Sequence, residues 1–388
     1  MSLFLDAARG KDTARAPIWI MRQAGRYLPE YNAIKERHGF WEMCRNPELA
    51  AEITLLPLKR FPLDAAILFS DIMTPLADMG VTVDFAPGPV IADPVRTEAD
   101  VARLRVPEPG AVAPFVATAV GMVRERCPVP LIGFAGAPLT LATYLVDSGG
   151  ARDGHAAFRG WLHREPVAAH RLLTKLTELT TGYLRSQIAA GVQAVQLFDS
   201  WAGALSPALY REFGQPYAAR VLDALGDSGV PRVYFAVGAH HLLADVSTLS
   251  AEVFGIDWRT PLDTARRALP GRTLQGNLDP TALTAEPAAL VERAREVLRQ
   301  GLGGPHLFNL GHGIRPDAPP DHVARLIEAV HAFDRHAAAE HRDAAERPEA
   351  AAPHADDAAR RHTGAPRASA ERPTEAGRPA GTPRGADA

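Results

Sequence analysis

The sequence has few of the features that mark secreted or membrane-spanning proteins. Its 388 residues include two cysteines, Cys44 and Cys127, which lie far apart and form no CxxC pair. A secreted domain stapled by disulfides needs a denser cysteine framework, so both thiols are expected to be reduced. There is no run of about 18 apolar residues, and the amino terminus lacks a basic segment followed by a long apolar core. These absences predict a soluble, cytoplasmic protein.

An excess of charge of one sign is also missing. The chain has 42 Lys and Arg residues against 45 Asp and Glu residues, which gives a formal net charge of −3. A field this weak predicts neither nucleic acid nor an anionic membrane as a partner. Any attraction for an acidic ligand must therefore come from a local cluster of cations.

Three common catalytic signatures are absent. The glycines at Gly301, Gly303 and Gly304 are not followed by the Lys-Ser/Thr ending of a phosphate-binding loop. The sequence contains no HExxH zinc motif, and no GxSxG nucleophile elbow precedes a helix.

The last part of the sequence lacks large apolar residues altogether. From His341 to Ala388 there is no Leu, Ile, Val, Met, Phe, Tyr, Trp or Cys. Such a segment buries too little apolar surface to offset the entropy of ordering it. The sequence therefore predicts a single folded domain over residues 1–338 and a disordered, Ala/Arg/Pro-rich tail over residues 339–388.

Within the folded part, eight short apolar runs alternate with longer segments of helical period, such as the face formed by Leu172, Leu176, Leu179 and Tyr183. This alternation predicts parallel strands joined by helices. With 46% hydrophobic residues, the chain suits a (β/α)8 TIM-type barrel, and a doubly wound open sheet is the alternative. The predicted strands are residues 18–21, 65–69, 130–134, 194–198, 232–236, 252–256, 273–275 and 306–310.

Polar or glycine residues follow nearly every apolar run. In a barrel, the carboxyl ends of the strands converge on the one face that carries active sites, so these residues would be neighbours. They are Arg22, Ser70, Asp71, Gly136, Asp199, Ser200, Gly238, Asp257, Asn277, Gly311 and His312.

Two arginines follow the first run, Arg22 and Arg26, four residues apart. Guanidinium groups hold carboxylates with two parallel hydrogen bonds and stay charged when partly buried, which suits a polyanionic ligand. The alternative is a solvated surface loop, which the neighbouring Gly25, Tyr27 and Pro29 disfavour.

Each of the other candidates has a structural alternative. Asp71 directly follows an apolar run, where an aspartate can stabilise a developing cation or cap the next helix. Tyr144 can hydrogen-bond a carboxylate or be a packed aromatic residue. Ser200 can bind substrate or cap a helix, with Asp199 as another possible actor. His312 lies between two glycines at a strand end, which favours an accessible functional histidine over a solvated loop residue.

Five segments, in this order and spacing, resemble the uroporphyrinogen decarboxylase family. They are PIWIMRQAGRYLPEY, FSDIM, GFAGAPLTLATYLV, LFDSWAG and FNLGHGI. The resemblance extends over residues 15–335 and leaves out the tail.

The resemblance implies a distorted (β/α)8 barrel, a homodimer, and a carboxy-lyase that uses neither metal nor organic cofactor. The implied substrate is a small-molecule tetrapyrrole, uroporphyrinogen III, whose four acetate side chains become methyl groups in coproporphyrinogen III during heme biosynthesis. The resemblance gives catalytic roles to Asp71 and Arg22. It implies substrate binding by Arg22, Gln23, Ala24, Gly25, Arg26, Asp71, Tyr144, Ser200 and His312.

Two other functions are compatible with a barrel of this kind. A corrinoid- or thiol-methyltransferase of the same superfamily would need zinc held by histidine and cysteine thiolates, but His240 and His241 have no cysteine nearby. A non-catalytic tetrapyrrole carrier would keep the arginines but would not need Asp71.

Overall fold

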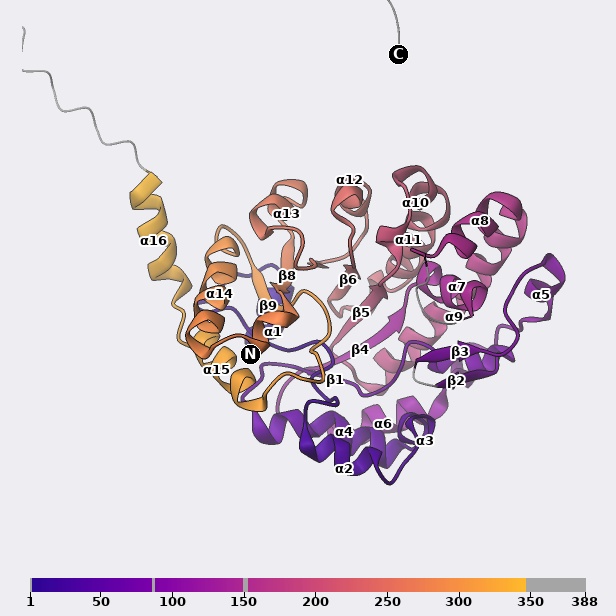
Figure 1. The fold of residues 1–388 in the computed structure, drawn as a ribbon, viewed down its shortest axis with the longest axis horizontal. Helices are drawn as coiled ribbons and strands as arrows, with labels where there is room; N and C mark the ends of the chain where they lie inside the picture. Colours follow the sequence, from indigo (N-terminus) through magenta and orange to yellow (C-terminus); the bar gives the residue numbers. More distant parts are fainter. Residues whose placement is uncertain (1, 86–87, 149–152, 347–388) are drawn as a thin grey trace, which may run out of the picture. The chain divides into compact units, whose positions relative to one another are not determined.

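Seven parallel strands form a curled sheet at the centre of the structure, a computed structural model that describes residues 2–85, 88–148 and 153–346. The strands of this sheet lie side by side in the order of the chain, with helices outside them (Figure 1). This order confirms the predicted (β/α)8-type barrel over a doubly wound sheet, in which the strand order reverses. The strands are β1 (Ala66–Ile67), β4 (Leu131–Gly136), β5 (Ala194–Asp199), β6 (Arg232–Ala236), β7 (Val253–Gly255), β8 (Thr273–Leu278) and β9 (His306–Leu310).

The segment around Ile18 lies between the two edge strands, β9 and β1. Ile18 forms a parallel bridge with Phe308 of β9, and its carbonyl oxygen accepts a hydrogen bond of 2.8 Å from the N–H of Asp64, just before β1. The predicted strand over residues 18–21 is wrong as a regular strand. The backbone turns back directly after Ile20, where a hydrogen bond of 2.8 Å closes the turn.

The other seven predicted strands are present. The runs at residues 232–236 and 306–310 match β6 and β9, and the others differ at their ends. The prediction for β8 ends too early, at residue 275. Gly276, with φ +133°, continues the pairing with β9, and the strand ends at Leu278.

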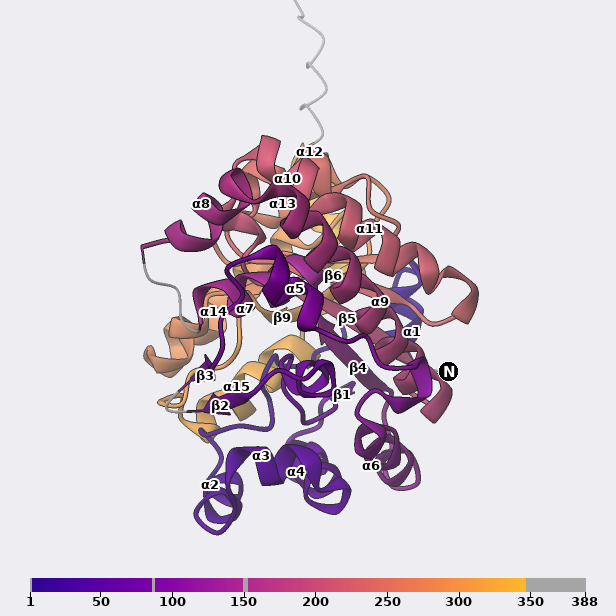
Figure 2. The same ribbon diagram turned by 90° about the vertical axis from the view of Figure 1, so that its right-hand side faces the viewer.

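Helices cover the outside of the sheet, and Figures 1 and 2 show them around the strands. Helix α4 packs on α6, α6 on α9, and α9 on α11. The predicted apolar face of α9 is confirmed, since all four of its residues are buried. The helices are α1 (Leu3–Ala8), α2 (Pro29–Lys35), α3 (Phe40–Arg45), α4 (Pro47–Arg60), α5 (Glu98–Arg103), α6 (Pro114–Arg124), α7 (Pro138–Asp147), α8 (Ala156–Arg164), α9 (Pro166–Ala190), α10 (Pro207–Phe213), α11 (Gln215–Ala224), α12 (Leu243–Val246), α13 (Leu262–Ala268), α14 (Pro287–Gln300), α15 (Pro320–His331) and α16 (Arg335–Glu346).

Three buried polar side chains connect elements across the interior of the barrel. The Trp19 indole N–H donates to Gln275 Oε1 of β8 at 3.0 Å. The Gln275 amide in turn donates to Gln196 Oε1 of β5, also at 3.0 Å. Buried polar groups need such partners, and this chain of bonds fixes the segment that leads into the loop carrying Arg22.

Two features lie outside the predicted pattern. An antiparallel pair, β2 (Val83–Phe85) and β3 (Pro89–Ile91), forms a separate small sheet. Helix α16 crosses the predicted domain boundary at residue 338, while residues 347–388 of the predicted tail lie outside the described residues. That boundary therefore stays a prediction. In the described part of the chain, no helix combines the length and apolar character needed to cross a membrane.

Candidate active site

The loop after the Ile18 segment presents Arg22. The N–H of Met21 donates to Asn309 Oδ1 (3.0 Å), and the Met21 carbonyl oxygen accepts from the N–H of Ile314 (2.9 Å). These bonds tie the loop to the end of β9. Arg22 itself is exposed and has φ +64°. A Cβ on Gly25 would lie 2.9 Å from the Arg22 carbonyl oxygen, so the loop closes this tightly only with glycine there.

The other predicted binding residues of this loop are placed differently. The Gln23 side chain is fully buried, accepts a hydrogen bond from a backbone N–H of its own loop (3.1 Å) and donates to the Ala65 carbonyl (3.3 Å). It therefore holds the loop in place from its buried side. Ala24 packs half-buried against the core, and the guanidinium of Arg26 is exposed near α2. Of this loop, Arg22 is the residue whose charge acts on the other predicted site residues.

Asp71 lies at the turn between β1 and the 3-10 helix η1 (Thr74–Met79). Its Oδ1 accepts a hydrogen bond from the N–H of Met73 (2.8 Å), while Oδ2 forms none with the described residues. Burial raises the pKa of Asp71, and the Met73 N–H and the charge of Arg22 oppose this rise. One carboxylate oxygen thus caps the turn, and the other is available to a ligand.

Tyr144 contacts Trp201, and Ser200 precedes Trp201 in the chain. Tyr144, on α7, is half-buried and its ring lies edge-on to the indole of Trp201, with centroids 5.9 Å apart. Burial raises the pKa of Tyr144, and the charge of Asp71 adds to the effect, so the hydroxyl stays a neutral donor. Ser200 follows β5 and is half-buried, and its hydroxyl forms no hydrogen bond with the described residues.

The two glycines around His312 allow close contacts on both sides. A Cβ on Gly313 would lie 2.4 Å from Arg22 Cδ, and a Cβ on Gly311 would lie 2.3 Å from the backbone nitrogen of Trp258. At Gly311 the close atom is backbone, so there is no room for a side chain, whereas at Gly313 an added Cβ would displace the Arg22 side chain. His312 is half-buried, and its ring lies edge-on to Trp258 with centroids 6.2 Å apart.

His312 is neutral at physiological pH. Burial lowers its pKa to about 4, the charges of Arg22 and Arg259 lower it as well, and Asp257 opposes them. A neutral imidazole can donate one hydrogen bond and accept another, but it is not a charged acid.

The charge of Arg22 acts on three of the predicted residues. It counteracts the burial-raised pKa of Asp71 and of Tyr144, and it adds to the burial that lowers the pKa of His312. These residues follow β1, β4 and β9, so they come together because the strands end on one face of the barrel. The structure brings these four side chains together, while their roles stay predictions.

Asp199 has a structural explanation. The hydroxyls of Thr140 and Tyr234 donate to its two carboxylate oxygens, each at 2.8 Å, and the side chain is fully buried. Thr140 also accepts a hydrogen bond from the N–H of Trp201 (3.2 Å). Asp199 therefore holds the turn that carries Ser200, and its oxygens already have partners.

The buried carboxyl of Asp199 leads to a prediction about stability. Burial raises the pKa of Asp199 to about 6, although the hydroxyls of Tyr234 and Thr140 lower it. The folded state thus holds this proton more tightly than the unfolded chain. The associated stability is fully present below about pH 4 and falls by ~3 kcal/mol as the pH rises through 6.

Asp199→Asn is therefore expected to raise the Tm at about pH 8 and to have a smaller effect at about pH 4.5. The asparagine amide can donate to the Tyr234 hydroxyl, which can then donate to the Tyr210 hydroxyl 2.8 Å away. Thermal unfolding at both pH values measures the difference. A variant that is equally destabilised at both would contradict the prediction.

One part of the site was missed from the sequence. Asp257 was identified at a strand end, but Trp258 and Arg259 after it were not. Arg259 lies with its guanidinium carbon 3.8 Å from the centroid of the Trp258 ring, which itself contacts His312. The available signal was their position, directly after the strand end marked by Asp257.

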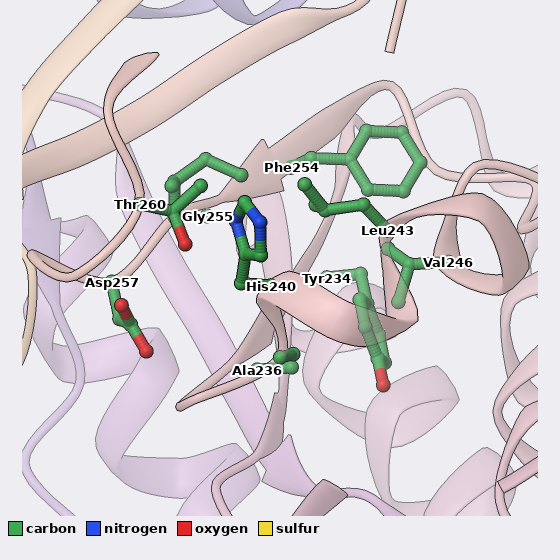
Figure 3. A pocket seen from close by; sticks show the side chains of 11 residues that line it. Tyr234, Ala236, His240, Leu243, Val246, Phe254, Gly255, Asp257 and Thr260 are labelled. Carbon is green, nitrogen blue, oxygen red and sulfur yellow. The ribbon is translucent and has the colours of Figure 1, made fainter. Parts of the chain in front are cut away.

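A small cavity lies behind this loop, between β6, β7 and α12 (Figure 3). In the figure, Asp257 and Thr260 lie on one side of it, Phe254 and Val246 lie on the other, and His240 lies between them. Its volume of about 20 Å³ has room for roughly one water molecule, so it is not a site for a macrocycle.

The cysteines and histidines do not form a thiolate site in the described chain. Cys44 is buried and Cys127 half-buried, both are free, and burial raises the pKa of both thiols. His241 bonds the carbonyl of Leu205 (2.9 Å). Among the residues that the structure describes, no group of three or more His, Cys, Asp and Glu side chains is placed to hold a metal ion.

Known proteins resemble the chain in sequence and in fold. The family model "Uroporphyrinogen decarboxylase (URO-D)" matches residues 1–333. A uroporphyrinogen decarboxylase of Mycobacterium tuberculosis (strain H37Rv) is 48% identical over 350 residues, which cover 86% of this chain and 98% of the relative. One of Geobacter metallireducens is 46% identical over 336 residues, with the same coverage.

Among solved structures, a methyltransferase from Methanosarcina mazei superposes with a TM-score of 0.72 at 21% sequence identity. The match covers 84% of this chain and 97% of the methyltransferase, and at this identity it shows a shared fold. The family match over most of the chain and the high identity to the two decarboxylases decide the assignment. The chain belongs to the uroporphyrinogen decarboxylase family.

Proposed function

We propose that this uroporphyrinogen decarboxylase carries out its reaction at the strand-end site, with Asp71 beneath the macrocycle and Arg22 at its rim. The observation that supports the proposal is that the charge of one cation, Arg22, acts on Asp71, Tyr144 and His312. Uroporphyrinogen has eight carboxylates and four pyrrole N–H groups, so it needs donors around its edge and an acceptor at its centre.

Asp71 is suited to be that central acceptor. Its Oδ2 forms no hydrogen bond with the described residues, while Oδ1 is fixed by the N–H of Met73. A carboxylate held this rigidly can accept pyrrole N–H bonds. A fixed negative charge of this kind also stabilises a cation that forms next to it.

The chemistry requires such a cation. Protonation of the pyrrole carbon next to an acetate-bearing carbon gives a positively charged ring. The C–C bond to the carboxylate then breaks, its electron pair flows into the ring, and CO2 leaves. A second proton adds to the exocyclic methylene, and the first proton returns to solvent from the ring carbon. Each acetate thus becomes a methyl group, with one proton consumed and one CO2 released.

The ring is its own electron sink, so we propose that no organic cofactor or metal takes part. Four such steps convert uroporphyrinogen III to coproporphyrinogen III.

The remaining residues surround the carboxylate side chains in this proposal. Arg22 and Arg26 offer charged donors, while Tyr144, Ser200 and His312 offer neutral ones. The side chains of Gln23 and Ala24 and the backbone of Gly25 shape the loop between the two arginines.

Neither Arg22 nor His312 is a good proton donor at neutral pH. An arginine side chain keeps its proton throughout the range in which enzymes work, and His312 is already neutral above its pKa of about 4. We propose that Arg22 positions a substrate carboxylate or a water molecule rather than giving up its own proton.

The test is anaerobic incubation of the purified protein with chemically reduced uroporphyrinogen, without added metal or cofactor. Chromatography of the oxidised products should show porphyrins with seven, six, five and then four carboxylates. Unchanged substrate in the presence of folded protein would overturn the proposal.

Two properties that follow from the family resemblance complete the proposal. We propose that the protein works as a homodimer in the cytoplasm. Sedimentation equilibrium should then give twice the mass of the chain, and a single-chain mass at micromolar concentration would contradict it.

A further inference from the structure

Arg259 lies at the strand ends, and its guanidinium is held in place although only one of its nitrogens has a hydrogen-bond partner among the described residues. It follows β7, and its guanidinium carbon lies 3.8 Å from the centroid of the Trp258 ring. Its Nη1 reaches Asp257 Oδ2 at 3.4 Å, which is long for a hydrogen bond. Its other nitrogens, Nε and Nη2, form no hydrogen bond with the described residues, and 53% of the side chain is exposed.

Asp257 is committed to the backbone rather than to Arg259. Its side chain is 1% exposed. It accepts hydrogen bonds from the N–H of Gly238 and, at 2.8 Å, from the N–H of Arg259. The carboxylate therefore fixes the β7 loop through main-chain bonds, and the weak contact to the guanidinium leaves that group available as a donor.

The position of Arg259 places it in the site. Gly311 packs on Trp258 and Gly313 packs on Arg22, so the loop with His312 lies between the two. The charges of Arg22 and of Arg259 both act on His312, whereas Arg22 is the cation that acts on Asp71. Arg259 thus acts on the same histidine as Arg22, and it contacts that histidine's neighbour in the site, Trp258.

We propose that Arg259 binds a carboxylate side chain of the substrate, as a third arginine of the site besides Arg22 and Arg26. This inference rests on the proposed function. The guanidinium lies over the Trp258 ring, and its Nε and Nη2 form a fork that can donate two parallel hydrogen bonds to a carboxylate. Because Arg22 is the cation whose charge acts on Asp71, while Arg259 acts on His312, we expect Arg259 to hold a side chain that is not reacting. Arg259 is therefore expected to bind the substrate equally well in the ground state and in the transition state.

The test compares Arg259→Met with a matched control in the anaerobic uroporphyrinogen assay. Methionine keeps an unbranched stem over Trp258 and removes the charged fork. The KM is expected to rise by about 10-fold, the lower end for a bond between charged groups, with kcat within about 2-fold of wild type.

Arg267→Met on α13 is the control. Arg267 has the same 3.4 Å contact with a nearby aspartate, Asp263, and 69% of its side chain is exposed. Its KM should be unchanged.

A second readout is the protonation of His312, followed by NMR in the free protein. Loss of the Arg259 charge, with Asp257 left unopposed, should raise the pKa of His312 from about 4 toward its usual value, while the charge of Arg22 still lowers it. Arg267→Met should leave this pKa unchanged.

The outcomes separate this inference from the function on which it rests. A wild-type KM for Arg259→Met, with a lower Tm, would mean that Arg259 only balances the charge of Asp257, and would overturn the inference. An unchanged pKa of His312 would place Arg259 outside the site and overturn it too. Failure of the wild-type protein to decarboxylate would instead overturn the proposed function.

Discussion

Asp71→Asn is expected to lower kcat/KM by about 10²–10³, the usual cost of removing one preorganised group that stabilises transition-state charge. Asparagine keeps the shape of the side chain, and its carbonyl oxygen can still accept the 2.8 Å bond from the N–H of Met73. The amide cannot stabilise a protonated pyrrole as a carboxylate does. Steady-state kinetics with uroporphyrinogen under anaerobic conditions measure the loss.

The same substitution should not weaken the fold. Burial raises the pKa of Asp71, so the folded state favours the protonated form and loses stability as the pH rises through that pKa. Removing the ionisable group is therefore expected to leave the Tm equal or higher at about pH 8. Thermal unfolding checks this.

A matched control separates the charge from the turn that it caps. Asp279 accepts a hydrogen bond from the N–H two residues later, at 2.9 Å, as Asp71 does at 2.8 Å. Asp279→Asn should keep wild-type turnover. Near-wild-type turnover for Asp71→Asn would remove Asp71 from the mechanism.

The sequence predicted the barrel and the place of the site because both depend on local patterns. Strands buried on both faces are continuous apolar runs, so seven of them could be identified. The first run could not be distinguished in this way. Ile18 is as apolar as a strand residue, and the turn after Ile20 depends on hydrogen bonds within a loop tied to β9. The short β2–β3 pair was missed because three-residue strands contain too little alternation to recognise.

The individual roles of site residues were harder to predict. Nothing local distinguishes Gln23, which supports the loop from inside, from Arg22, which faces outward beside it. Asp199 and Asp71 both follow strands, yet only the structure shows that Thr140 and Tyr234 already bond both oxygens of Asp199. Arg259 was not identified because its contact with Trp258 can be seen only in the structure.

Arg22→Met is expected to lower kcat/KM by about 10³, since it removes a guanidinium able to form two charge-assisted bonds with a carboxylate. It should also change the pH profile. The charge of Arg22 opposes the burial that raises the pKa of Asp71, so this pKa should rise further in the variant. As the pH is lowered, the variant should therefore lose activity at a higher pH than the wild-type protein does. If the activity of the variant falls at the same acidic pH as that of the wild type, the electrostatic role of Arg22 is contradicted.

Two further variants separate the charge of Arg22 from its position. Arg22→Lys keeps the charge but not the fork, so we expect a lower kcat/KM with the acid limb near its wild-type pH. Gly313→Ala keeps the arginine but places a Cβ 2.4 Å from its Cδ, so the guanidinium must move. Activity should fall by up to roughly 10²-fold, the order expected when a positioning group is displaced by about 1 Å. Gly39→Ala, with nothing within 4 Å of the added carbon, is the control. If Gly313→Ala has wild-type kinetics, the placement of Arg22 against this glycine is not needed for turnover.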